Sequence, residues 1–486
     1  CSFKKSNEGR SLPANGKEHV CPERQVRKML SEQMTSLLQE SCAGAFIQER
    51  SRIRAMELSL GTLCALGRRT LSRSICAVGR QHQDWSADYK IFSRSHWEPN
   101  LLFTPVLKEY CLRYAADQPV CIAFDDTKIA RSGRKIKSAF WQRDPLSPPF
   151  HVNFMYGLRF MHASLIFPHY RDGDFSARGY PVRFVECPAV KKPGKKATDA
   201  ERLAYKKAIK TQNLSQQGLT IIGGLRDNLD SLGETRRKMI IAVDGSLCNR
   251  TIFSKPLERV DIVGRCRKDA RLCFPAPKGG RRIYGQERFS PEAVRRDDSI
   301  PWRTCRIHFG GAWRDIRFKE VNGVLWQRGA GRRHLRLLVV APQPYKTSVN
   351  AKRNYRDPAY LLSTDTEGNV QTLLQCYFDR WQIEVNHREQ KDTIGIGNAQ
   401  VWSTKSVPRQ PAFVAASYSL LLLAGLKAFG PGRTHDFVPL PKWRKKATRP
   451  SALDLITLLR KEINEAPITD FLKCNIAKNI MAYAYT

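Results

Sequence analysis

The chain has 486 residues and carries 82 Lys and Arg against 45 Asp and Glu, which gives a formal net charge of +37. Hydrophobic residues make up 42% of it, so the composition excludes an intrinsically disordered protein and allows one large core or two to three domains. The positive charge predicts a partner with a dense negative charge, first nucleic acid and second an anionic membrane surface. Charge alone does not separate an enzyme from a binding protein.

The cysteines and apolar segments indicate in which cellular compartment the protein is found. The 14 cysteines are spread singly without a Cys-x2-Cys pair, which argues against structural zinc and favours free thiols in a reducing cytosol. The start at Cys1 suggests a trimmed or alternatively started reading frame, and no signal-peptide pattern follows it. Residues 411–430 approach the length of a membrane span but include Ser417, Tyr418 and Lys427, so we expect a buried core helix. We predict a cytoplasmic protein with no membrane partner.

The first part of the chain is predicted to be helical. Residues 1–25 are polar and expected to be frayed, whereas in residues 23–66 apolar side chains recur at three- to four-residue steps. A helix ending at Gly67, a basic turn and a second helix from about Thr70 resemble a helix-turn-helix, although two short helices joined by a glycine are common in any α domain. The candidate DNA contacts of this segment are Arg68, Arg69, Arg73 and Arg80.

Two apolar strands lead directly into aspartates. Residues 120–124 run into Asp125 and Asp126, as a buried central strand does when it delivers acids to a sheet edge. Neighbouring side chains of a strand face opposite sides, so only one of these two acids can point to a given site. Residues 238–243 repeat the pattern and lead into Asp244. A turn that begins with Asp is ordinary after one strand; two such strands in one chain are less so.

The intervening and following segments have distinct characters. Residues 84–103 are aromatic and irregular, and residues 153–168 give two strand-like runs broken near Gly157. Residues 190–217 are lysine-rich and predicted to be helical from about Thr198; they form a solvated face whose charge also fits contact with a phosphate backbone. Residues 249–366 carry β signals separated by Gly and Pro, with Trp and Arg able to stack on bases and hold phosphates.

The stretch from Tyr377 to Lys391 contains no Gly or Pro and is predicted to be one continuous helix. At about 100° per residue, Tyr377, Arg380, Glu384 and Lys391 fall on one narrow stripe, and Arg388 lies beside them. Cations in such a stripe can hold phosphate oxygens while the acid coordinates a metal ion. The alternative is a solvated helix face laced with ion pairs.

In chain order, Asp126-Thr127, Asp244-Gly245-Ser246 and the Tyr-x2-Arg-x3-Glu-x6-Lys pattern of residues 377–391 resemble the DDE transposases of bacterial insertion sequences. The resemblance covers roughly residues 115–430. It implies an α/β fold with an RNase H-like mixed sheet flanked by helices, a mainly β insertion, and helical N- and C-terminal regions.

The resemblance also implies roles for individual residues. Asp126, Asp244 and Glu384 would hold two Mg²⁺ ions, for which Mn²⁺ can substitute, and the choice of Asp126 over Asp125 rests on the family pattern, in which the acid directly before Thr is the ligand. The residues expected to contact DNA phosphate are Tyr377, Arg380 and Lys391, with Arg388 as an unassigned helper. Tyr360 or Trp326 is a candidate to stack against a displaced base, which leaves a DNA hairpin step open.

The predicted function is therefore a cut-and-paste DNA transposase that acts as a homodimer on terminal inverted repeats and target DNA, in association with the bacterial nucleoid. Two alternatives are a transposase-derived DNA-binding protein without catalysis and a stand-alone RNase H-like nuclease. The expected organisation, in order, is a helical DNA-binding region at 1–105, a first part of the catalytic core at 106–250, a β-rich insertion at 251–366, the last part of the core at 367–430, and a basic linker with a helical tail at 431–486 that could dimerise.

Overall fold

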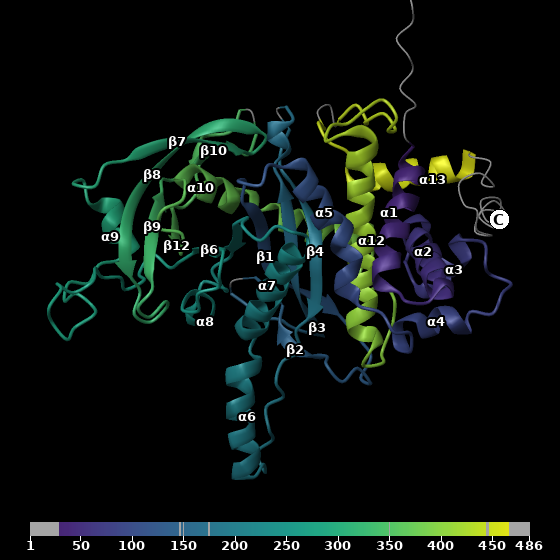
Figure 1. The fold of residues 1–486 in the computed structure, drawn as a ribbon, viewed down its shortest axis with the longest axis horizontal. Coiled ribbons are helices and arrows are strands. Elements are labelled where there is room, and N and C mark those ends of the chain that lie inside the picture. The colour runs from purple at the N-terminus through teal and green to yellow at the C-terminus, as the bar shows by residue number, and fades with distance from the viewer. Residues whose placement is uncertain are drawn as a thin grey trace, which may run out of the picture.

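The structure is a computed structural model that describes residues 29–465, apart from 145–146, 149, 174, 349 and 444–446. The frayed start expected for residues 1–25 lies outside the described residues, and so does the tail after residue 465. The described residues form a mixed α/β fold in which one large sheet is flanked by helices (Figure 1). This agrees with the α/β class expected from the sequence.

A ten-stranded sheet runs through the molecule in the order β2-β3-β1-β5-β6-β12-β9-β8-β7, with β4 paired to β3. Three strands of its first half are antiparallel neighbours: β1 (Val120–Ala130), β3 (Phe154–Phe167) and β4 (Arg178–Glu186). On its other side β1 pairs in parallel with β5 (Met239–Val243), which pairs in parallel with β6 (Val260–Arg265). The carboxyl ends of β1, β5 and β6 therefore share one edge, called the carboxyl edge below.

The strands of the β-rich segment extend this same sheet. β12 (Ala359–Ser363) pairs antiparallel with β6, and β9 (His334–Val340), β8 (Ala312–Leu325) and β7 (Arg303–Phe309) continue the antiparallel order outward. The predicted insertion is thus a continuation of the central sheet in space. The remaining short strands are β2 (Phe140–Arg143), which pairs with β3 at the other end of the sheet, and β10 (Pro344–Tyr345) and β11 (Asn354–Tyr355), which form a separate ribbon. Two short helices, α8 (Arg250–Phe253) and α9 (Pro291–Arg296), lie in the β-rich segment.

Helices cover both faces of the sheet. Successive residues of β5 alternate between two apolar clusters, one that includes Leu373 and Leu374 of α10 (Val370–Asp379) and one that includes Leu225 and Leu229 of α7 (Leu214–Ser231). Because neighbouring side chains of a strand face opposite sides, α10 and α7 lie on opposite faces. α11 (Gln382–Arg388) continues on the α10 face, where Ile383 packs against Ala123 of β1.

The helices from the two ends of the chain pack together beside β4 (Figure 1). α12 (Ser406–Phe429) is long and apolar enough to cross a membrane, but 83% of its most apolar window is buried inside the protein. This confirms the expected buried core helix. Around it lie α1 (Leu30–Ala45), α2 (Glu49–Cys64), α3 (Leu71–Ala77), α4 (Ser86–Ser93), η1 (Pro99–Phe103), α5 (Thr104–Arg113) and α13 (Ala452–Glu465).

One helix stands away from the body. α6 (Asp199–Gln212) projects beyond the carboxyl edge, and none of its residues is buried (Figure 1). The predicted start near Thr198 is confirmed, because the Thr198 side chain accepts a hydrogen bond from the N–H of Glu201 and the Glu201 side chain accepts one from the N–H of Thr198. This reciprocal capping satisfies donors that a helix start leaves unpaired.

The first acidic strand is longer than predicted. β1 continues through Asp125 and Asp126 to Ala130, because β3 still pairs with it after the parallel pairing with β5 ends at Phe124. The two acids therefore lie within the strand, on the part that extends past its parallel neighbour.

Other local predictions were also wrong. β3 is one continuous strand: a Cβ at Gly157 would lie 2.4 Å from the carbonyl oxygen of Ile129, so this glycine permits a close backbone approach and does not break the strand. The stretch 84–103 holds α4 and η1, so it is not irregular. The cysteines within the described residues are free, as expected.

Candidate active site

Two carboxylates and an imidazole meet at the carboxyl edge of the sheet. Asp125 of β1 and Glu384 and His387 of α11 each offer one ligand atom, and these atoms lie within 4.8 Å of one another. Ala123 packs against Ile383 of α11, and side chains two residues apart in a strand share a face, so this contact aims Asp125 at Glu384. The sheet and the helix thus bring distant parts of the sequence to one point.

Asp126 lies beside this group without joining it. Its Oδ2 is 3.7 Å from Nε of Arg159 on β3, and its backbone N–H donates to Oδ1 of Asp125 at 2.8 Å. The family resemblance favoured Asp126 as the ligand, whereas the structure groups Asp125 with Glu384. The reason is the alternation of side chains along β1, which turns the two carboxylates to different sides.

Asp244 directly follows the last residue of β5 and is 47% exposed at the same edge. Its carbonyl oxygen accepts hydrogen bonds from the N–H groups of Leu247 (3.1 Å) and Cys248 (3.2 Å), which holds the chain in a turn. Its Oδ1 lies 3.9 Å from Nη2 of Arg380. Asp244 is outside the 4.8 Å group, and Arg380 connects it to the acid-bearing helix.

Two N–H groups of the Arg380 side chain have no acceptor among the described residues. Its Nε and Nη1 are buried and have no hydrogen-bond partner there. Its guanidinium carbon lies 5.8 Å from the centre of the Tyr377 ring. A buried donor without an acceptor is costly, and a guanidinium matches the geometry of phosphate oxygens. The site is therefore suited to an anionic group beside the carboxylates.

The stretch from Tyr377 to Lys391 is divided, contrary to the prediction of one helix. α10 ends at Asp379, a tightened turn follows in which the N–H of Ile383 donates to the carbonyl of Arg380 at 3.0 Å, and after α11 comes a π-helical turn, η3 (Glu389–Thr393). A single stripe at a constant angle per residue therefore does not exist. Such π-helical turns are frequent at functional sites. Lys391 in η3 and Arg388 at the end of α11 are both exposed.

The two acids of the group have different electrostatics. Burial, followed by the charge of Asp126, raises the pKa of Asp125 to about 7. The His387 ring, whose Nδ1 lies 3.8 Å from Oε2 of Glu384, lowers the pKa of Glu384, and the charges of Arg380 and Lys391 act in the same direction. A bound divalent cation favours the ionised form of both carboxyls.

Buried polar contacts fix the position of α11. Asn386 accepts from the Ser164 hydroxyl at 2.7 Å and donates to the Tyr418 hydroxyl at 3.0 Å. In η3, the Glu389 carboxylate accepts from the Tyr418 hydroxyl at 2.5 Å and from the N–H of Ala452, the first residue of α13, at 3.2 Å. These contacts join α11 and η3 to β3, α12 and α13.

Two histidines were missed by the sequence analysis. His387 follows Glu384 by three residues, a spacing that puts both on one side of a helix and was an available signal. His162 of β3 pairs with Asp125 in the sheet, is fully buried, and has its ring centre 4.9 Å from that of His387. No sequence pattern marked His162.

A basic cavity of about 1940 Å³ begins at Gly245, next to Asp244. Both aromatic stacking candidates, Trp326 and Tyr360, line it. Tyr360 is 5% exposed and its hydroxyl donates to Glu292, which restricts it to a wall of the cavity. The charged lining is dominated by Arg265, Arg267, Lys268, Arg271, Arg288, Arg295, Arg296 and Arg328. The cavity therefore suits a polyanion that passes Asp244.

The four arginines predicted to read DNA have different surroundings. Arg68 and Arg73 are exposed, and the N–H of Arg69 donates at 3.0 Å to Oδ1 of Asn398, in the loop that follows η3. Arg80 is buried, with Nη1 2.9 Å from Glu57 and 2.8 Å from Asp88. This internal ion pairing corrects the prediction that Arg80 contacts DNA. The remaining candidates are Arg68 and Arg69 in the basic turn and Arg73 in α3.

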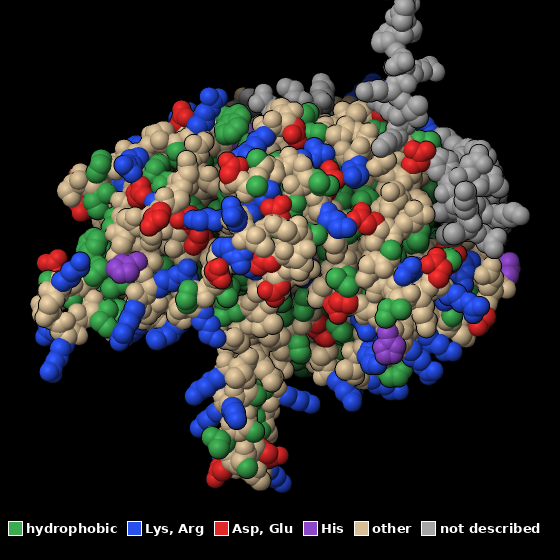
Figure 2. All heavy atoms as spheres, in the orientation of Figure 1, with side chains coloured by type: hydrophobic (Ala, Val, Ile, Leu, Met, Phe, Trp, Pro, Cys, Tyr) green, Lys and Arg blue, Asp and Glu red, His purple; other side chains and the backbone are tan. Residues whose placement is uncertain are grey.

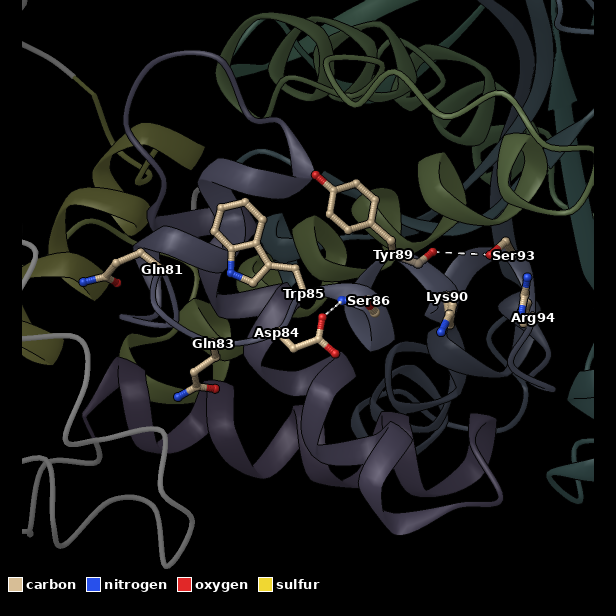
Figure 3. Close-up of a pocket in the computed structure, with 9 residues that line it drawn as sticks. All are labelled: Gln81, Gln83, Asp84, Trp85, Ser86, Tyr89, Lys90, Ser93 and Arg94. Carbon is tan, nitrogen blue, oxygen red and sulfur yellow. Dashed lines mark hydrogen bonds between the residues drawn. The ribbon is translucent and has the colours of Figure 1, made fainter.

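A shallow hollow of about 750 Å³ is lined by α4 and the residues just before it (Figure 3). It is lined by Trp85, Tyr89, Lys90 and Arg94 among others, and Nε1 of Trp85 donates to the carbonyl of Arg80 at 2.8 Å. None of the acids at the carboxyl edge lines this hollow, so it is separate from the candidate active site.

Comparison with known proteins assigns no family. No protein-family model matches the sequence, and no curated protein matches it at a significant level.

Proposed function

We propose that this protein cleaves and joins DNA strands with divalent metal ions, as the transposase of an insertion sequence. One observation carries the proposal: Asp125 and Glu384 converge at the carboxyl edge, where Arg380 offers buried donors without partners among the described residues. Carboxylate oxygens are the ligands that Mg²⁺ and Mn²⁺ prefer, and a guanidinium fork binds phosphate oxygens. The two requirements of phosphodiester chemistry thus occur side by side.

The sheet supports an RNase H-like core, the fold that the sequence resemblance implies. Its antiparallel strands β4, β3 and β1 are followed by β5 and β6 in parallel with β1, and helices cover both faces. Parallel strands that end at one edge deliver side chains to a common site. In this arrangement the first two acid positions come from β1 and from the end of β5.

The chain's residues then have distinct roles. The Asp125–Asp126 pair, Asp244 and Glu384 would hold two Mg²⁺ or Mn²⁺ ions. Bound there, the ions would lower the pKa of an attacking hydroxyl and stabilise the leaving oxygen of an in-line displacement. Arg380 would hold the scissile phosphate, and His387 would hold Glu384 in its ligating position.

Other basic residues would position the DNA around the cut. Tyr377 and Lys391, with Arg388 as helper, would contact phosphates next to Arg380, while the basic cavity and its wall of Trp326 and Tyr360 would receive the strand beyond Asp244. Lys and Arg side chains also occupy much of the lower margin of the molecule in Figure 2, the side from which α6 projects. The proposed partners are terminal inverted repeats and target DNA, bound by a homodimer in the bacterial nucleoid.

The test is cleavage of DNA that carries the ends of the element, in Mg²⁺ or Mn²⁺, by the wild-type protein and by the E384Q variant. We expect metal-dependent cleavage by the wild type and its loss in E384Q. The matched control is E258Q, which removes a carboxylate that is 85% exposed and outside the site, and should cleave like the wild type. Persistent cleavage by E384Q would overturn the site assignment.

The alternative functions give different results in the same assay. Binding of the ends without cleavage in either metal would identify a catalytically silent DNA-binding protein. Cleavage without joining of a free 3′-hydroxyl end to target DNA would identify a stand-alone nuclease. Joined products establish strand transfer.

A further inference from the structure

The projecting segment of residues 188–213, called the basic arm below, has no packing role that accounts for its helix. It descends from the end of β4 as a loop and returns as α6, in which no residue is buried (Figure 1). A helix of this length is marginal in water without tertiary contacts. Because none of the residues of α6 is buried, contacts with the protein's own core do not explain why this segment is helical.

The arm is stiffened where it joins the body. Asn213 ends α6 and begins α7: its Oδ1 accepts from the N–H of Gln216 at 2.9 Å, and its Nδ2 donates to the carbonyl of Ile209 at 3.1 Å. α7 itself is anchored by side chains in the main core. The direction in which the arm projects therefore depends on how α7 packs against the sheet.

The base of the arm is tied to the loop that carries the second acid. The Ser215 hydroxyl in the first turn of α7 accepts from Nδ2 of Asn249 at 2.9 Å, and the same Nδ2 donates to the carbonyl of Ser246 at 3.1 Å. Ser246 lies two residues after Asp244. The arm thus begins beside the proposed active site and extends away from it.

The exposed surface of the arm is strongly basic. Its acids lie at the start of α6, where Glu201 is bonded to Thr198 and Asp199 lies 3.8 Å from Arg202. No carboxylate in the described part of the chain is within ion-pair distance of Lys206, Lys207 or Lys210. The exposed cations of the arm are Lys191, Lys192, Lys195, Lys196, Arg202, Lys206, Lys207 and Lys210.

Several of these cations form a row. Arg202, Lys206 and Lys210 recur every four residues, which places them on one side of α6 at intervals of about 6 Å. Duplex DNA carries a phosphate every ~3.4 Å of its axis on each strand, so such a row can meet about every second phosphate of one backbone. An arm without a binding pocket reads charge and not sequence.

We propose that the basic arm binds the phosphate backbone of duplex DNA that extends from the active site, and so holds the DNA segment flanking the cut. This inference rests on the proposed function for the position of the DNA. It assigns the occupant by charge complementarity, because the arm presents a row of cations whose lysines have no acidic partner among the described residues.

The test compares K206E/K210E with K352E/R353E by measuring affinity for a 40-base-pair duplex in EDTA over a range of salt concentrations. The control makes the same charge change on exposed residues next to β11, in the hairpin with β10 that lies on the side of the molecule away from the arm in Figure 1. We expect weaker binding by K206E/K210E and a salt slope, log K against log salt, that is smaller by roughly 0.9 for each lost phosphate contact. The control should keep the wild-type slope.

Equal effects of the two double variants would overturn the proposal, because only the total charge would then matter. Unchanged DNA affinity in K206E/K210E combined with loss of a dimer by sedimentation would instead assign the arm to a second copy of the chain, and would also overturn it. Since no residue of α6 is buried, circular dichroism should show an intact fold in the variant. The assay needs neither metal nor cleavage. If the proposed chemistry failed, the binding result would therefore still test the arm.

Discussion

Nη2 of Arg380 lies 3.9 Å from Oδ1 of Asp244, while the Nε and Nη1 atoms of the same guanidinium are buried without a partner in the described chain. One side chain thus touches the acid at the end of β5 and keeps two donors free next to the acids of β1 and α11. This arrangement makes Arg380 the strongest candidate to hold a scissile phosphate.

We expect R380A to lower the cleavage rate at saturating DNA by about 10²–10³-fold, the usual loss when one preorganised donor to the transition state is removed. R380K should recover only part of the rate, because an ammonium lacks the bidentate fork. Single-turnover cleavage of labelled DNA measures both.

The comparison for this substitution is R388A, which removes an exposed cation from α11. We expect R388A to weaken DNA binding and to leave the rate at saturation within a few-fold of wild type. A rate loss in R388A as large as that in R380A would contradict the proposal that Arg380 in particular holds the scissile phosphate.

The Asp125–Asp126 pair gives a second prediction. D125N and D126N should each lose most metal-dependent cleavage, since Asp125 lies with Glu384 and the charge of Asp126 acts on it. Cysteine variants separate the roles, because a thiolate is a softer ligand that favours Mn²⁺ over Mg²⁺. The geometry predicts recovery in Mn²⁺ for D125C. Recovery in D126C alone would give the ligand role to Asp126, as the family resemblance does.

His387 gives a third prediction. Its ring lies against Glu384 and should hold that carboxylate in place without touching DNA. H387N should raise the metal concentration for half-maximal cleavage by about 10–100-fold, the usual cost of losing a group that orients a metal ligand. At saturating metal the rate should stay within a few-fold of wild type. H82N, at an exposed histidine, is the control, and an unchanged metal requirement in H387N would contradict the role.

The buried carboxyl group of Asp379 should make the folding stability of the protein depend on pH. Burial raises the pKa of Asp379 to about 8, against about 3.9 in an unfolded chain. Between these values the native protein holds a proton that the unfolded chain has released, so this group's contribution to stability is full below pH ~4 and is lost as the pH rises through about 8.

The D379N variant should lack this dependence and should be the more stable protein at pH 8, by on the order of a few kcal/mol. Urea unfolding of both proteins at several pH values measures the difference, in which the other titrating groups cancel. Parallel pH profiles for the two proteins would show that Asp379 does not titrate as its burial implies.

Much of the site was predictable because local patterns decide it. The apolar runs before Asp125 and Asp244 form the paired parallel parts of β1 and β5, and the helical character around Glu384 follows from its composition. Thr198 was a readable helix start because its capping partner lies only three residues away.

What the sequence did not predict depends on partners distant in the chain. The face of β1 that meets α11 is set by packing of Ala123 on Ile383, so periodicity alone left Asp125 and Asp126 undecided. The break at Arg380 has no Gly or Pro to mark it. The burial of Arg80 depends on Asp88 of the next helix, and the extension of the central sheet by the β-rich segment depends on the pairing of β6 with β12.

Glu389 links the helix that carries Glu384 to the C-terminal helices α12 and α13. It joins the end of the acid-bearing helix to Tyr418 of α12 and to the first residue of α13, while Arg380 ties the other end to Asp244. The position of Glu384 therefore depends on contacts at both ends of its helical segment, with Asp244 at one end and with α12 and α13 at the other. A contact that shifts those helices would therefore reach Glu384 through Glu389, so the proposed dimer and the proposed metal site would share this connection.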